Sequence, residues 1–146
     1  MTEYTKQRLE TRIVRESLSE LPAIHSSDEA YRLLKDLESE MVEKFTVLFM
    51  DTRNRVLALV VMFSGGMTES VVDIRILIKT ALDIGATTFL IAHNHPSGDP
   101  RPSAEDRAIT TKIQQAAKLF DIRLLDHIVV GHEGYLSFAD EGTLVP

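Results

Sequence analysis

Hydrophobic and polar positions follow two different periods along the chain, and these separate predicted helices from predicted strands. Apolar residues recur at helical spacing in three segments, residues 28–40, 69–84 and 103–120. β-branched and aromatic residues are concentrated in five strand-length segments, residues 45–50, 55–63, 87–92, 122–130 and 134–138. Hairpins at both ends, with one strand between two helices, predict a single α/β domain with a mixed β-sheet flanked by helices.

The central part of this pattern indicates a well-covered sheet. Residues 69–84 are apolar around most of the helix circumference, so we expect this helix to be buried against a sheet. Residues 87–92 form a continuous apolar run, as expected for a strand covered on both faces. The turn-forming cluster at 51–54 joins the first two strands into a hairpin. Residues 93–102, with three prolines and a glycine, are predicted to be a loop.

The amino-terminal part of the chain has a weaker pattern. Residues 11–16 form a possible edge strand within an extension that covers residues 1–25. A serine before two acidic residues, at 26–29, is typical of a helix start. We therefore place the main domain at residues 26–146.

Composition limits the chemistry and the partners. There is no cysteine, so disulfides, cysteine nucleophiles and thiolate zinc ligands are excluded, and zinc would be held by His and carboxylate groups. A net charge of −6 argues against nucleic acid as a tight direct ligand. No apolar run approaches the roughly 20 residues of a membrane helix, and the first ten residues lack the apolar core of a secretory signal. We expect a cytoplasmic protein without a membrane partner.

Two histidines and an aspartate follow the central strand at spacings that suit a metal site. His93 and His95 are two residues apart, so an extended backbone directs both imidazoles to the same side. If Ser103 is the N-cap of the next helix, Asp106 lies in its first turn, near the strand end. Three protein ligands would leave the fourth position of a zinc ion to water, whose pKa zinc lowers to about 7. This arrangement is typical of a catalytic site.

Each of these residues also has an ordinary structural explanation. The helix dipole favours an Asp in a first turn, Ser is a common N-cap, and a His-x-His pair at a strand end is often a polar edge. The complete order, His-x-His-Pro followed by a loop and Ser-x-x-Asp, favours the metal site.

The same residues resemble a known protein family. His93-x-His95, seven further residues and Ser103-x-x-Asp106 match the JAMM (MPN+) metalloprotease motif at every fixed position. The strings HNHPSGDPRPS at 93–103 and LLDHIVVG at 124–131 resemble the RadC family of JAMM-like bacterial proteins, and the resemblance covers residues 26–146. It implies a JAMM or cytidine-deaminase-like fold, zinc at His93, His95 and Asp106, and Ser103 as a hydrogen-bond donor to the oxyanion.

JAMM enzymes also use a glutamate about fifty residues before the histidine pair, just ahead of the first core strand. The resemblance places it at Glu43, which precedes the predicted strand at 45–50. A carboxylate there can take a proton from water and pass it to the leaving amine. Glu40 is the alternative general base and Glu69 a third candidate. The structural alternative for Glu43 is a solvated residue at a helix–strand junction.

The sequence departs from the RadC pattern in two places. Family members usually carry a Pro-Arg-Glu triplet at the start of the central helix. Residues 72–76 here read VDIRI, which keeps an Arg but has neither Pro nor Glu. Longer RadC proteins have an amino-terminal helix-hairpin-helix region, and we expect none in this sequence. Both departures put in doubt the contacts that those elements make, a DNA contact in particular.

Other polar residues near the motif leave their roles open. His127, next to Asp126 in a predicted strand, is either a hydrogen-bonded structural residue or a group that supports the site. Asn94 and Ser97 fit backbone capping, although either could line the cleft.

The leading hypothesis is a zinc metallopeptidase-like hydrolase that cleaves a peptide or isopeptide bond. The alternative is a non-catalytic binding module associated with DNA repair or processing proteins, the role that the RadC name implies. A nuclease of the His-Asn-His type would need histidines much further apart, and a zinc deaminase would need cysteine ligands. Substrate, oligomeric state and pathway stay open.

Overall fold

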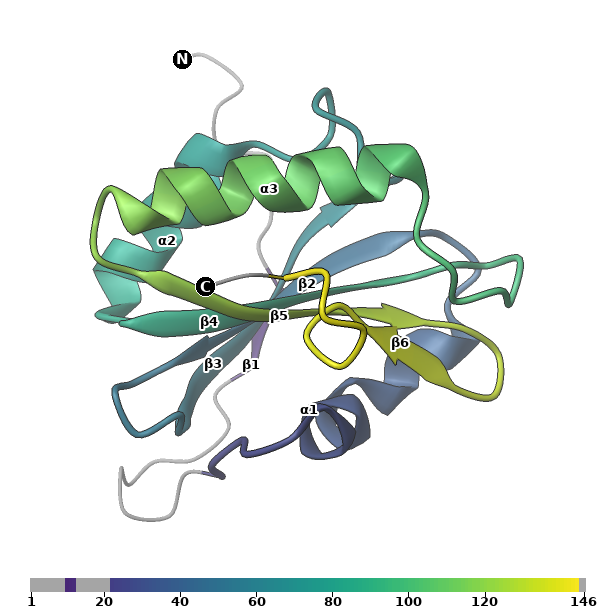
Figure 1. The fold of residues 1–146 in the computed structure, drawn as a ribbon, viewed down its shortest axis with the longest axis horizontal. Helices are drawn as coiled ribbons and strands as arrows, with labels where there is room; N and C mark the ends of the chain where they lie inside the picture. The colour runs from purple at the N-terminus through teal and green to yellow at the C-terminus, as the bar shows by residue number, and fades with distance from the viewer. Residues whose placement is uncertain (1–9, 13–21, 145–146) are drawn as a thin grey trace.

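The computed structural model describes residues 10–12 and 22–144, which form a six-stranded sheet between two helical layers (Figure 1). The strands are β1 (Glu10–Arg12), β2 (Lys44–Met50), β3 (Val56–Ser64), β4 (Thr88–Asn94), β5 (Arg123–Val130) and β6 (Tyr135–Ser137). The helices are α1 (Ser27–Leu34), the 3₁₀ helix η3 (Lys35–Ser39), α2 (Ile74–Ile84) and α3 (Ala104–Lys118). The strand order is β1-β3-β2-β4-β5-β6, in which β4 and β5 are parallel and all other neighbours are antiparallel. The predicted mixed α/β fold is confirmed.

Each face of the sheet has its own hydrophobic core. Helices α2 and α3 cover one face, and α1 with η3 covers the other (Figure 1). Alternate residues of β2 and β4 enter the two cores, so Phe45 and Ile91 pack beneath α2 and α3 whereas Leu48 and Leu90 pack against α1. Burial on both faces explains why β4 is apolar without interruption.

The predicted hairpin is present, and its turn has clear causes. The Asp51 carboxylate accepts hydrogen bonds from the backbone N–H groups of Arg53 and Arg55, and Asn54 takes a positive φ of 57°. The predicted edge strand at 11–16 corresponds to β1, which pairs with β3; residues 13–16 lie outside the described part of the chain. The described helices include none that is long and apolar enough to cross a membrane.

Three predicted boundaries were wrong. The central helix starts at Ile74 rather than 69, because Val71 and Val72 donate to the carbonyl of Thr68 in a turn and Asp73 then caps the helix. The predicted helix at 28–40 narrows to a 3₁₀ helix after Leu34. Strand β4 continues through Asn94, so His93 lies within the strand and the loop begins later.

Candidate metal centre

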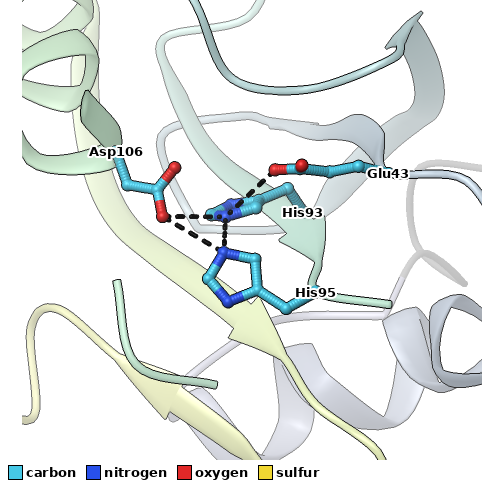
Figure 2. A group of neighbouring side chains, drawn as sticks. All are labelled: Glu43, His93, His95 and Asp106. Carbon is cyan, nitrogen blue, oxygen red and sulfur yellow. Dashed lines mark hydrogen bonds and ion pairs between the residues drawn. The ribbon is translucent and has the colours of Figure 1, made fainter. Parts of the chain in front are cut away.

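The two motif histidines lie where β4 ends, on the face of the sheet that α3 covers. His93 is fully buried, and His95, just beyond the strand, has 17% of its side chain exposed. Their two-residue spacing directs both rings to the same side, and the two Nε2 atoms are 2.9 Å apart (Figure 2). The structure thus brings both predicted imidazoles to one point.

Asp106 reaches the same point from the first turn of α3. Ser103 is the N-cap of this helix, and its hydroxyl oxygen accepts a hydrogen bond from Asp106 N, while Ser103 N donates to Asp106 Oδ2 at 2.8 Å. This reciprocal capping box fixes the carboxylate. Asp106 Oδ2 also lies 3.1 Å from His95 Nε2 and 3.3 Å from His93 Nε2.

Glu43 approaches from the residue before β2. Strand β2 pairs with β4 so that Phe45 is opposite His93. This register brings the residues just before β2 beside the end of β4. Glu43 Oε1 lies 3.7 Å from His93 Nε2, and 28% of the Glu43 side chain is exposed. Figure 2 shows this carboxylate facing the histidine pair from the side opposite Asp106.

The other two candidate glutamates lie apart from this cluster. The Glu40 carboxylate pairs with Lys44 Nζ at 3.2 Å, and the Glu69 carboxylate pairs with Lys112 on α3. The structure therefore brings Glu43 to the histidines and neither of its alternatives. Its catalytic role stays a prediction.

The four side chains could hold a metal ion, because their ligand atoms all lie within 4.8 Å of one another. The two histidine Nε2 atoms and Asp106 Oδ2 form a triangle with sides of 2.9, 3.1 and 3.3 Å. Ligands bound at about 2.0–2.1 Å around a tetrahedral zinc ion are roughly 3.3 Å apart. The triangle is close in size to one face of such a tetrahedron, so the residues present fit the metal that the motif implies.

The charges at the site favour a cation. Burial by itself raises the pKa of Asp106, but the contacts with His93 and His95 outweigh it and hold that pKa well below its usual range. The hydrogen bond to Asp106 in turn raises the pKa of His95. The nearby Glu43 carboxylate raises the pKa of His95 as well. The carboxylates of Asp106 and Glu43 thus stabilise positive charge beside the imidazoles, whether a proton or a metal ion carries it.

His95 is oriented by the loop that follows it. Its Nδ1 contacts the carbonyl oxygen of Asp99 at 2.8 Å. A carbonyl can only accept, so the proton of a neutral His95 lies on Nδ1 and its Nε2 presents a lone pair to the cluster. This is the tautomer that binds a metal through Nε2.

Sequence reasoning left open or missed three residues that support the cluster. Asn94 Oδ1 accepts from Lys44 N at 2.7 Å, and its Nδ2 donates to the carbonyls of Val42 and Glu40, so it holds the segment that carries Glu43. His127 and Thr110 continue the hydrogen bonds inward from His93. The available signals were an Asn between the two histidines, and a Thr one helical turn after Asp106.

Comparison with known proteins agrees with the motif. The model of the RadC-like JAB domain matches residues 24–143. The chain is 38% identical to a UPF0758 protein of Flavobacterium johnsoniae over 87% of this chain and 56% of that protein. It is 42% identical to a UPF0758 protein of Pasteurella multocida over 91% of this chain and 60% of that protein.

A third relative, a UPF0758 protein of a Janthinobacterium species, is 38% identical over 97% of this chain and 65% of that protein. The chain thus spans less than two thirds of the length of these relatives. The match to the family model covers most of the sequence, including all four residues of the cluster. The chain therefore belongs to the RadC-like JAB domain family.

Proposed function

We propose that this chain is a zinc-dependent hydrolase that cleaves an amide bond of the peptide or isopeptide type. The observation that carries the proposal is the position of Glu43. Its partly exposed carboxylate lies 3.7 Å from His93 Nε2, beside a triangle of donor atoms that fits a tetrahedral metal ion. Membership of the RadC-like JAB domain family supports the same chemistry.

The donor set supports zinc among the divalent metals. Two imidazole nitrogens and one carboxylate oxygen form a ligand set that zinc takes in catalytic sites, where a fourth position stays open. Magnesium and calcium prefer sites made of oxygen ligands. A bound zinc ion would lower the pKa of a water molecule to about 7 and polarise a carbonyl group.

Glu43 and Ser103 are the residues proposed to act on the substrate. The Glu43 carboxylate can take a proton from water and deliver it to the leaving nitrogen, since it lies beside the cluster and keeps access to solvent. The Ser103 oxygen accepts from Asp106 N, which leaves its hydroxyl hydrogen able to donate to an oxyanion. Ser103 is exposed, so a substrate can reach it.

The metal content of the purified protein tests the first half of this proposal. We expect about one zinc ion per chain in wild type and a large loss in His93→Ala and His95→Ala. Elemental analysis after dialysis measures it. A folded wild-type protein that takes up no zinc would defeat the proposal.

The general base is tested by Glu43→Gln with Glu40→Gln as its matched control. Both variants replace a glutamate of the same segment, but only Glu43 faces the cluster. Against a diverse set of peptides and isopeptides, Glu43→Gln should keep zinc and lose roughly 10²–10⁴-fold in turnover. Glu40→Gln should stay near wild type. Equal activity of the two variants would reassign the base.

The alternative, a binding module for DNA repair or processing proteins, has a distinct outcome. It requires that zinc-loaded wild type hydrolyse no member of the set, and that Glu43→Gln keep every binding function of the wild type. Turnover that depends on Glu43 would exclude it.

A further inference from the structure

A path of three short hydrogen bonds leads inward from the metal centre. His93 Nδ1 lies 2.7 Å from His127 Nε2 on β5, and His127 Nδ1 lies 2.6 Å from Thr110 Oγ1 on α3. Thr110 Oγ1 lies 2.6 Å from the backbone carbonyl oxygen of Asp106. All of these side chains are buried, with at most 2% of any residue exposed. The path therefore joins two of the candidate ligands, His93 and Asp106, through His127 and Thr110.

The last acceptor in this path fixes the direction of the first two hydrogen bonds. A carbonyl oxygen cannot donate, so the Thr110 hydroxyl donates its single hydrogen to the backbone carbonyl oxygen of Asp106. Thr110 Oγ1 must then accept from His127, which places a proton on His127 Nδ1. A second proton on this ring would bury a charge with no carboxylate hydrogen-bonded to the ring, which is costly. His127 Nε2 therefore accepts from His93 Nδ1–H.

The consequence reaches the metal centre. With its proton on Nδ1, a neutral His93 has a lone pair on Nε2, the atom that faces His95 and Asp106. The opposite tautomer would place a hydrogen on Nε2 and block metal binding there. We infer that His127 is a positioning residue, which sets the tautomer and the ring orientation of His93 for metal binding. Thr110 sets the tautomer of His127 by accepting the hydrogen bond from its Nδ1. The inference rests on the proposed function and deepens it.

Packing holds the His127 ring in the required plane. The ring stacks on Phe138 with centroids 4.4 Å apart and planes 23° apart. The guanidinium of the exposed Arg107 lies over the Phe138 ring, 5.6 Å from its centre. The centroids of the His127 and His93 rings are 4.8 Å apart. A ring fixed by stacking and by two hydrogen bonds loses little further freedom when the metal binds.

Zinc affinity of the full chain, measured by competition with a chromophoric chelator, is the first test. His127→Phe removes the acceptor for His93 Nδ1–H and should weaken zinc binding by about 10–100-fold. His127→Gln retains an acceptor oxygen and should recover part of this loss. Should His127→Phe fail to fold, Thr110→Val and Thr110→Ser supply the same contrast, since only Ser restores the hydroxyl.

Thr111→Val is the matched control. Thr111 is the next residue on α3, is exposed, and makes the same type of bond, from its hydroxyl to the carbonyl of Arg107. Thr110→Val should weaken zinc binding and Thr111→Val should not. Equal zinc affinities of wild type, Thr110→Val and His127→Phe would overturn the inference while leaving the proposed zinc site intact.

Nitrogen-15 NMR of the imidazoles in the metal-free protein supplies a readout that a merely structural role would not change. We expect the His93 proton on Nδ1 in wild type, and a mixture of both tautomers in Thr110→Val. A His93 proton held on Nε2 in wild type would refute the inference, whether or not the protein binds zinc. Absence of zinc binding in wild type would instead defeat the proposed function.

Discussion

Asp106 shows how one side chain can serve both the fold and the site. Its Oδ2 atom accepts the backbone N–H of Ser103 and faces both histidines. The helix cap therefore fixes the donor atom before any metal arrives, and little side-chain entropy is left to lose on binding. Such a double role explains why an ordinary capping motif and a metal motif share the letters Ser-x-x-Asp.

Substitution of Asp106 should separate these two roles. In Asp106→Asn the amide oxygen can still accept from Ser103 N, but the negative charge is lost, so we expect zinc affinity to fall more than about tenfold with the cap retained. Asp106→Ala should also lose about 0.5–2 kcal/mol of unfolding free energy in the metal-free protein. Chelator competition and urea unfolding measure the two effects.

Glu105→Gln is the control for Asp106, because Glu105 is an exposed acid in the same first turn of α3. It should leave zinc affinity within about threefold of wild type, since its charge is screened by solvent. Wild-type zinc affinity in Asp106→Asn would show that this carboxylate is not a ligand.

At the scale of elements, the site depends on contacts between strands that lie side by side in the sheet. Asn94, at the end of β4, holds the segment before β2 through hydrogen bonds to Lys44 N and to the carbonyl of Val42. Alternation along β4 directs Asn94 away from the side on which His93 and His95 lie. One three-residue stretch therefore supplies two candidate ligands and the anchor for the candidate base.

Asn94→Ala should therefore impair turnover more than metal binding. The loss of the anchor lets Glu43 move from its place 3.7 Å from His93 Nε2, whereas the imidazoles keep their own supports. We expect zinc affinity within about threefold of wild type, kcat lower by at least about tenfold, and roughly 1–3 kcal/mol of lost stability. Chelator competition, steady-state kinetics and urea unfolding measure these. Unchanged kcat would show that Glu43 needs no anchor.

The turn between β2 and β3 should give the stability of the chain a defined pH dependence. Burial raises the pKa of Asp51, but hydrogen bonds from Arg55 N, Arg53 N and Arg55 Nε outweigh it, so the folded pKa is lowered from 3.8. A lowered carboxyl pKa contributes stability that is fully present above the unfolded pKa and is lost as pH falls through the folded value. Asp51→Asn should cost roughly 1 kcal/mol near neutral pH.

This cost should shrink as the pH falls below about 4, because protonation removes the same charge from wild type. Urea unfolding of both proteins at several pH values checks it. Asp83→Asn is a suitable control, because the pair of Asp83 with Lys79 is exposed and should contribute little at any pH. A cost for Asp51→Asn that stays constant down to pH 2.5 would contradict the argument.

At the scale of the whole molecule, the sequence could predict what local spacing determines. The His93–His95 pair, the cap at Ser103 and the apolar run of β4 each depend on a few neighbouring residues, and the structure places them together as expected. The contacts of His127 could not be predicted, because His93 and Thr110 lie 34 and 17 residues away in sequence. They depend on the sheet register, which short-range patterns do not specify.

An irregularity in the β4–β5 pairing makes this plain. Phe89 pairs with Leu124, but the register shifts before the next pair, so that Ile91 lies opposite His127. Without the shift, Asp126 would lie opposite Ile91 and the following side chains would change faces. A single irregular position between Phe89 and Leu90 thus decides whether His127 meets His93.

Metal binding should stabilise the entire chain against unfolding. The candidate ligands come from the end of β4 and the first turn of α3, so a bound ion would link the helical layer to the sheet. Zinc at about 100 times its dissociation constant should stabilise the folded state by about 2.7 kcal/mol. At about 2–4 °C per kcal/mol, the midpoint of thermal unfolding should rise by roughly 5–11 °C.

The location of the amides that zinc protects distinguishes an ion that links α3 to β4 from an ion bound elsewhere. Hydrogen exchange should slow most at the first-turn amides of α3, around Asp106, because a bound zinc ion would hold this end of the helix against β4. The amides of α1, on the opposite face of the sheet, should gain only the global increment. His95→Ala should lose both the thermal shift and the local protection, since a ligand is missing. A full thermal shift in His95→Ala would place the stabilising ion at another site and would separate stability from the chemistry proposed for this one.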